Sequence, residues 1–120
     1  MQRRATKNTR GPNADEQAFQ AWCKEQACVI SGQTGVSVHH MYGSAFKHNK
    51  VLIGHWAVIP LSYEYHQGEK GYHTIGQKLW CFKYGNQATY WKDLVKAYEL
   101  YMGEPMVPND VYMAIMDWGR

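Results

Sequence analysis

The sequence has too few cysteines for a disulfide framework and no hydrophobic run of membrane length. Its three cysteines, Cys23, Cys28 and Cys81, are odd in number and irregularly spaced, which excludes the disulfide-stabilised class of small secreted domains. The polar N-terminus has no signal-peptide core, and no glycine-rich phosphate loop is present. We therefore expect a cytoplasmic protein that does not bind a membrane.

Acidic residues are scarce where the basic ones gather. Residues 1–12 contain no acid, and residues 37–83 hold five lysines and all six histidines against two glutamates. The formal net charge of +3 is therefore concentrated in these two segments, where a polyanion is expected to bind. For the tail alone, a solubilising role is an equally open interpretation. Its basic residues are Arg3, Arg4, Lys7 and Arg10.

The composition is that of a single globular domain. The chain has 120 residues, is 45% hydrophobic and contains five Trp, nine Tyr and three Phe. Residues 1–12 have no apolar periodicity and end in Gly-Pro, so we predict a disordered tail. Residues 13–120 are predicted to form the domain.

The patterning predicts an α+β fold in which two strands lie among helices. The best-marked helix covers 89–102, where Trp91, Val95 and Tyr98 recur on one face and Gly103 ends the run. The other predicted helices are 13–27, a short one at 62–67, one from 73 to 85, and 108–118. The predicted strands are 36–40 and 56–61, separated by a loop over 43–54.

The six histidines lie within 35 residues, and four of them are candidates for chemistry. On a strand, His39 and His40 point to opposite faces, so that one can bind a metal while its neighbour acts as a base. His66 and His73 follow the second strand and are placed to return to the first pair. His48 is expected to be a solvated loop residue. Spacing alone leaves metal binding and ordinary packing equally open.

The order of these residues resembles a known family. The matching stretches are Cys28-Val-Ile-Ser31, Val38-His39-His40, Pro60-Leu61-Ser62-Tyr63-Glu64-Tyr65-His66-Gln67-Gly68 and Gly71-Tyr72-His73. They resemble the HNH endonucleases, also called the ββα-metal or His-Me finger group. The branch most similar is the phage-borne RecA-dependent nuclease known as recombination enhancement function. The resemblance spans roughly residues 15–100 and implies a ββα-metal hairpin and helix with flanking helices.

The resemblance also implies a role for each matched histidine. His40 would be the general base, and His39, His66 and His73 would bind one divalent ion, Zn, Mg or Mn. His55 stands nearest to the central Asn of the family motif, either as a catalytic part or as a residue that orients the hairpin. Lys47, Lys50, Lys70 and the basic tail would contact DNA phosphates.

The sequence departs from the family where related domains bind a structural zinc. Ser31, Ser62 and Tyr65 occupy positions of expected zinc ligands, so no cysteine-based zinc is expected. The leading hypothesis is a metal-dependent DNA endonuclease of phage or prophage origin, linked to recombination or DNA processing and acting with a recombinase filament. The alternative is a non-catalytic DNA-binding or accessory domain. A structural zinc module that uses only histidines is less favoured, because His39 and His40 do not easily reach one ion together.

Overall fold

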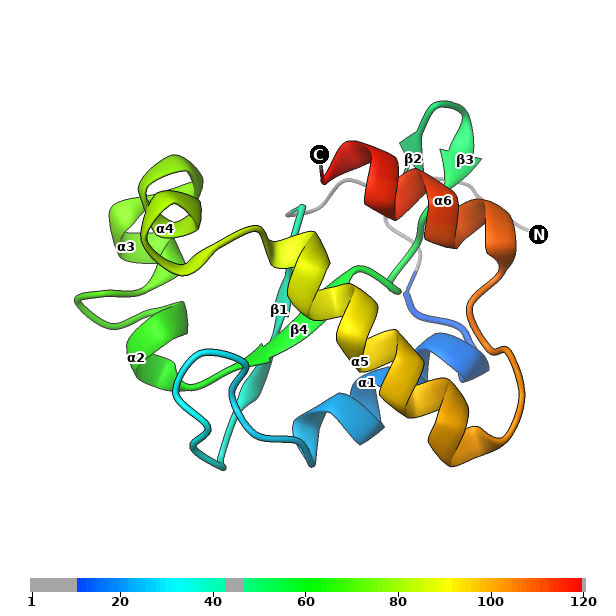
Figure 1. Ribbon diagram of the computed structural model, residues 1–120, viewed down its shortest axis with the longest axis horizontal. Coiled ribbons are helices and arrows are strands. Elements are labelled where there is room, and N and C mark those ends of the chain that lie inside the picture. The colour runs from blue at the N-terminus through cyan, green and yellow to red at the C-terminus, as the bar shows by residue number, and fades with distance from the viewer. Residues whose placement is uncertain (1–10, 43–46, 120) are drawn as a thin grey trace.

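The computed structural model describes residues 11–42 and 47–119, which form a mixed arrangement of helices and short antiparallel strands (Figure 1). The predicted α+β class is therefore confirmed. The helices are α1 (Ala14–Lys24), α2 (Tyr63–His66), α3 (Tyr72–Ile75), α4 (Gln77–Tyr84), α5 (Gln87–Met102) and α6 (Asn109–Trp118). The strands are β1 (Ser37–His40), β2 (Lys47–His48), β3 (Val51–Leu52) and β4 (Val58–Leu61).

Strands β1 and β4 form the antiparallel pair at the centre of the fold. In the register, Ser37 lies opposite Leu61 and His40 opposite Val58. Every residue of β4 is buried, whereas in β1 only His39 is. Successive side chains on a strand point to opposite faces, and this alternation separates the buried His39 from the half-buried His40, as the sequence predicts.

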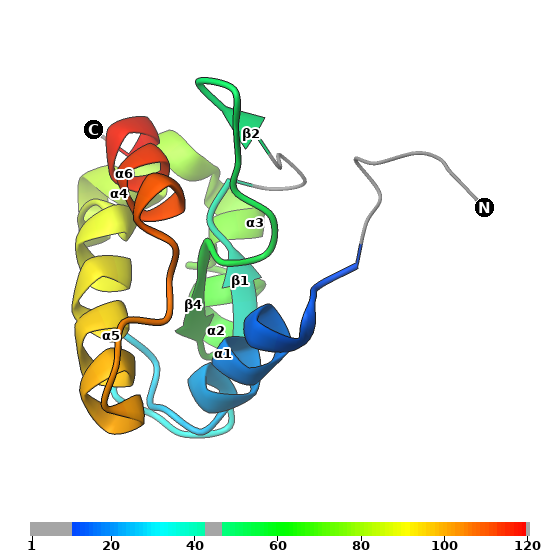
Figure 2. The ribbon, with the colours of Figure 1, turned by 90° about the vertical axis from the view of Figure 1, so that its right-hand side faces the viewer.

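Helices α1 and α5 both pack against this hairpin (Figure 2). A capping box between Asn13 and Glu16 starts α1, and Gly103 in the left-handed conformation ends α5. The aromatic side chains of both helices meet beneath the hairpin. Phe19 lies 5.6 Å from Trp56 and 5.1 Å from Tyr98 between ring centroids.

Three short helices follow β4 and build the end of the molecule that carries His66 and His73 (Figure 1). The continuous helix predicted from 73 to 85 is wrong, because the chain breaks between α3 and α4 at Gly76. This residue has φ +88°, a conformation that residues other than glycine rarely adopt. The break turns α4 away from α3 and lets Trp80 pack into the core.

The opposite end holds the small hairpin of β2 and β3, which packs against α6. The prediction of a loop over 43–54 is therefore wrong for residues 47–52. Asn49 and Lys50 both have positive φ, which suits the tight turn between these strands. His48 is half-buried and lies 2.8 Å from Asp117, so its prediction as a solvated residue is also wrong.

No helix in the described parts of the chain combines the length and the hydrophobicity needed to cross a membrane.

Candidate metal centre

Three histidines from three elements converge beside the central hairpin. His39 comes from β1, His66 from the end of α2 and His73 from α3. One ring nitrogen from each lies within 4.8 Å of the others. His39 and His66 are buried, whereas His73 is exposed, so the cluster is open to solvent on the side of α3. These are the three residues that the resemblance assigns to a metal ion.

His39 is held in an orientation that leaves one nitrogen for a ligand. Its Nε2 lies 3.0 Å from Oε1 of Gln87, so Nε2 donates to the amide oxygen and Nδ1 keeps its lone pair. Nδ1 is buried and has no hydrogen-bond partner among the described residues. The Tyr72 ring packs against the imidazole at 4.3 Å between centroids. A buried acceptor without a partner is costly, and a bound cation would satisfy it.

His66 and His73 present the same type of atom to each other. Their two Nε2 atoms are 3.0 Å apart. Nδ1 of His66 lies 2.9 Å from Oγ of Ser37, an oxygen that accepts when Nδ1 carries the proton. Nε2 of His66 is then unprotonated and available as a metal ligand. Oε1 of Gln87 can only accept, so it selects the His39 tautomer with an unprotonated Nδ1, and the Ser37 hydroxyl is compatible with the His66 tautomer that has an unprotonated Nε2.

Burial and mutual repulsion favour the neutral imidazoles. Burial, with additional repulsion from His66, lowers the pKa of His39 from 6.5 to about 3. Burial likewise lowers the pKa of His66, and the neighbouring His73 and His40 lower it further. Because metal ions bind the neutral form of histidine, this environment prepares both residues as ligands at neutral pH.

His40 lies on the other face of β1, where it meets His55. Nε2 of His40 and Nδ1 of His55 are 3.4 Å apart. Burial, followed by repulsion from His55, lowers the pKa of His40, which keeps it unprotonated and able to accept a proton near neutral pH. The backbone of His55 is fixed by α1, since its N–H donates to Glu16 at 2.7 Å and its carbonyl accepts from Gln20 at 2.9 Å.

Three residues that support the histidines were not identified from the sequence. Ser37 and Gln87 orient the metal-binding candidates, and the buried Glu16 holds the His55 backbone. The Asn13-to-Glu16 capping box gave a local signal for Glu16. Gln87 lies 48 residues from His39 in sequence, so no local pattern links the two.

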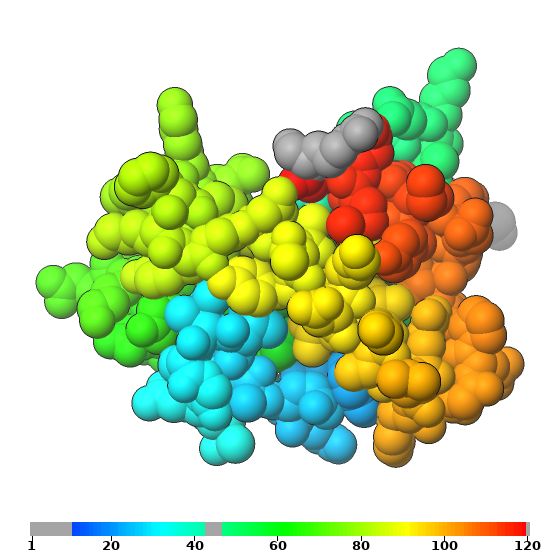
Figure 3. All heavy atoms as spheres, viewed as in Figure 1, coloured from blue at the N-terminus to red at the C-terminus, as the bar shows by residue number. Residues whose placement is uncertain are grey.

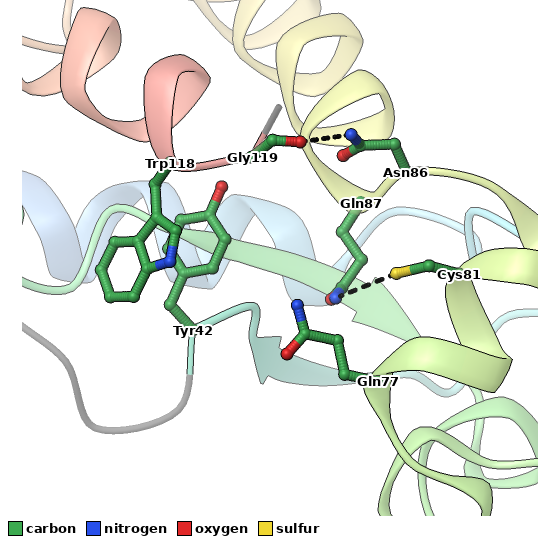
Figure 4. Close-up of a pocket in the computed structure, with 7 residues that line it drawn as sticks. All are labelled: Tyr42, Gln77, Cys81, Asn86, Gln87, Trp118 and Gly119. Atoms are coloured by element: carbon green, nitrogen blue, oxygen red, sulfur yellow. Dashed lines mark hydrogen bonds between the residues drawn. The ribbon is translucent and has the colours of Figure 1, made fainter.

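Gln87 also lines a cavity of about 280 Å³ that opens between α4 and the C-terminal end of α6 (Figure 4). Its side-chain nitrogen points to Sγ of Cys81 at 3.9 Å, and the stacked rings of Tyr42 and Trp118 form the facing wall. Gln87 is therefore held from both sides, with its oxygen on His39 and its nitrogen toward Cys81.

The lysines predicted to contact DNA lie apart from one another. Lys47 and Lys50 are exposed on the β2–β3 hairpin, which packs against α6 rather than beside the histidine cluster (Figure 1). Lys70 is exposed next to α2 and lies 3.8 Å from Glu64, which offsets its charge. The predicted tail residues Arg3, Arg4, Lys7 and Arg10 lie outside the described residues.

We call the turn from Cys28 to Ser31, with the neighbouring Ser62, the Cys28 corner. Its polar side-chain atoms form hydrogen bonds within the protein. Sγ of Cys28 accepts the backbone N–H groups of Ile30 and Ser31, each at 3.4 Å. The hydroxyl oxygens of Ser31 and Ser62 are 3.5 Å apart. Among the side chains joined by these hydrogen bonds, only that of Cys28 is a usual zinc ligand.

No family model, curated protein or solved structure matches this chain. The resemblance to HNH endonucleases therefore stays a prediction from the residues themselves.

Proposed function

We propose that this protein is a metal-dependent DNA endonuclease of the HNH, ββα-metal type, which hydrolyses phosphodiester bonds. The observation that carries the proposal is the convergence of three histidines that each place one ring nitrogen within 4.8 Å of the others, together with the buried Nδ1 of His39, which has no partner among the described residues. Packed histidines without a ligand usually satisfy their buried nitrogens within the protein. Here the nitrogens of His66 have partners in Ser37 and His73, whereas the buried Nδ1 of His39 has none among the described residues, and a bound cation would satisfy it.

The residues divide into metal ligands and a base. His39, His66 and His73 would hold one divalent ion, which supplies Lewis-acid stabilisation of charge on the scissile phosphate and on the leaving oxygen. His40 takes the proton from the attacking water, because it is neutral and lies outside the ligand set. His55 orients His40 through the contact between their rings.

The ligand set contains nitrogen only and no carboxylate. Imidazole suits zinc and other transition metals, whereas magnesium prefers oxygen ligands. Zinc should therefore bind most tightly among zinc, manganese and magnesium. Manganese or magnesium remains a candidate for the working ion, since tight binding and fast turnover are separate properties.

DNA is the proposed partner because the charge distribution favours a polyanion. Lys47 and Lys50 are exposed cations with no ion pair to a described residue. They and the basic tail would contribute affinity that does not depend on sequence. Encoding by a phage or prophage, a role in recombination and a recombinase filament as second partner are carried by the resemblance alone. The cytoplasmic location is proposed from the small, odd number of irregularly spaced cysteines.

A second candidate is a non-catalytic DNA-binding or accessory domain. The Cys28 corner favours it, since this chain has hydrogen-bonded serines where the related nucleases bind zinc. A domain that had lost the structural zinc site at the Cys28 corner need not have kept the catalytic activity of the histidine cluster. The two candidates differ in a single property, which is turnover.

The experiment is a cleavage assay with matched variants. The protein is loaded with zinc, manganese or magnesium and offered plasmid, single-stranded, nicked and recombinase-coated DNA. We expect cleavage by the wild type and a loss of roughly 10² to 10⁴ in rate for His40→Ala, with metal binding retained. His39→Ala should lose metal affinity and activity together.

His48→Ala is the control, because His48 contacts Asp117 and Trp118 and lies outside both histidine groups. It should cut DNA at the wild-type rate. If the wild type cuts none of these substrates with any of the three metals, the binding-domain candidate takes the place of the nuclease. If His40→Ala cuts as fast as the wild type, the base is another residue.

A further inference from the structure

The outward side of α4 exposes apolar side chains to water. Phe82 is 86% exposed, the highest value among the large hydrophobic residues of the described chain, and Leu79 is 44% exposed. The same helix buries Trp80 completely, so α4 has a well-packed inner side. Phe82 contributes nothing to that core. An aromatic ring that the fold leaves in water is a candidate for contact with a ligand.

Two lysines flank these apolar side chains. Lys78 and Phe82 are four residues apart, as are Leu79 and Lys83, so the four residues occupy one side of the helix. Both lysines are exposed, and neither forms an ion pair with a described carboxylate. The sequence from 72 to 84 contains no Asp or Glu. We call Lys78, Leu79, Phe82 and Lys83 the α4 platform.

The platform is connected to the metal centre through α3 and through a row of contacting rings. Helix α4 joins α3, which carries His73, through Gly76 alone. On its inner side Trp80 packs against Tyr72 at 6.1 Å, and Tyr72 packs against His39 at 4.3 Å between ring centroids. In Figure 3, α3 and α4 form the yellow-green lobe at one end of the molecule, from which side chains project into solvent. A polymer bound to the platform would lie on the side of α4 opposite Trp80, on the helix that follows α3 in the chain.

We infer that the α4 platform binds single-stranded DNA, with Phe82 stacking on a base and the two lysines contacting phosphates. This inference rests on the proposed function for the identity of the polymer. Alternating cations and exposed rings are the usual means of binding single strands. In a duplex the faces of the bases are stacked on one another, so an exposed ring finds no free partner.

The charge of the platform argues against self-association. In a symmetric pair, the same surface of each copy would meet, which would bring the lysines of one copy against those of the other. Like charges placed face to face oppose association. A single strand offers both complementary features, the phosphate charge and the flat base.

The test measures binding by the full chain in EDTA, where cleavage does not interfere. Fluorescence anisotropy compares a labelled oligothymidine with a duplex of the same length. Phe82→Ala should weaken binding to the single strand by roughly 5- to 150-fold, the loss that corresponds to one stacked base. Phe82→Leu should lose nearly as much, because it stays apolar but has no ring, and Phe82→Trp should restore binding. Binding to the duplex should change far less.

The lysines are tested by the salt dependence. Replacing both Lys78 and Lys83 with Ser should reduce the slope of log K against log salt by about 1.4 on a single strand. The controls are Leu100→Ala, at 75% exposure on α5, and the paired change of the exposed Lys92 and Lys96 to Ser. Both controls should bind the single strand as the wild type does.

Several outcomes would overturn the platform. The first is that the wild type does not bind the single strand. The second and third are that Phe82→Ala and Leu100→Ala lose the same affinity, or that Phe82→Ala loses the same affinity for duplex and single strand. The fourth is a dimer in sedimentation that depends on Phe82. The proposed function fails separately. A wild type that binds single strands through Phe82 but never cuts refutes only the nuclease, and one that cuts while Phe82 variants bind normally refutes only the platform.

Discussion

Two clusters of rings pack against the same β1–β4 hairpin, and they differ in what they leave unsatisfied. Phe19, Trp22, Trp56 and Tyr98 form an apolar cluster of contacting rings, in which the buried hydroxyl of Tyr98 has no hydrogen-bond partner among the described residues. In the other cluster, His39, His66 and His73 turn ring nitrogens toward one another, and Nδ1 of His39 has no described partner. Each cluster thus buries one polar atom without a described partner, but only in the second does that atom belong to a group of side chains that could hold a metal ion.

The difference assigns separate tasks to the two clusters. The hydrophobic effect stabilises the aromatic cluster in proportion to its buried area. The histidine cluster gains less, because Nδ1 of His39 loses water without gaining a hydrogen-bond partner among the described residues. We therefore expect the aromatic cluster to determine folding and the histidine cluster to determine metal binding. Each prediction below tests that separation.

The largest expected effect is on stability and comes from the aromatic cluster. Phe19→Ala removes a fully buried ring and should lower the free energy of unfolding by about 3–5 kcal/mol. His73→Ala removes an exposed side chain and should change it by less than about 0.5 kcal/mol while metal binding is lost. Urea denaturation of the metal-free proteins measures both. Similar losses for the two variants would mean that the clusters share the task of folding.

Acid should destabilise the metal-free protein through the histidine cluster. The pKa of His39 falls from 6.5 to about 3 on folding, so below pH 6.5 the unfolded chain binds a proton that the folded protein does not. Stability is therefore fully present above pH 6.5 and falls as the pH drops toward 3. Between pH 6.5 and 5 the loss from His39 is roughly 2 kcal/mol.

His39→Phe is the matched variant, since it keeps a ring but cannot take up a proton. Urea denaturation at several pH values in EDTA should show a smaller dependence on pH for this variant than for the wild type. An unchanged dependence would place the titration at other groups.

Replacing Gln87 should lower metal affinity but should not change proton transfer to His40. Gln87→Leu removes the acceptor for Nε2 of His39, so the ring no longer prefers the tautomer with a free Nδ1. We expect metal affinity to fall by roughly 10- to 100-fold, and saturating metal to restore most activity. Competition with a chromophoric chelator measures the affinity. The control is Gln77→Leu, since Gln77 is exposed on α4. Asn86 is not suitable, because it caps α5.

The smallest expected effect is that of metal removal on the fold. Since the Cys28 corner is closed by hydrogen bonds within the protein, no metal is needed there. EDTA should leave the circular dichroism spectrum unchanged and abolish cleavage. Unfolding of the chain by EDTA would show that a metal ion is part of the core, and the contrast between the two clusters would no longer hold.

The sequence predicted the histidine cluster better than its surroundings. The strand that carries His39 and His40, and the return of the chain to His66 and His73, follow from local hydrophobic patterning and from the resemblance. Gln87 and Ser37 could not be predicted, because their roles depend on contacts across 48 and 29 residues. The break at Gly76 was missed since a glycine inside a helical pattern is often tolerated.

The central claim is that His39, His66 and His73 bind one metal ion. The most direct test is anomalous scattering, measured at the zinc edge from crystals grown with zinc. We predict one ion per chain, about 2.0–2.1 Å from a nitrogen of each of the three rings, with Nδ1 as the ligand atom of His39. An ion at His48 and Asp117, or no ordered zinc at the three histidines, would contradict the account.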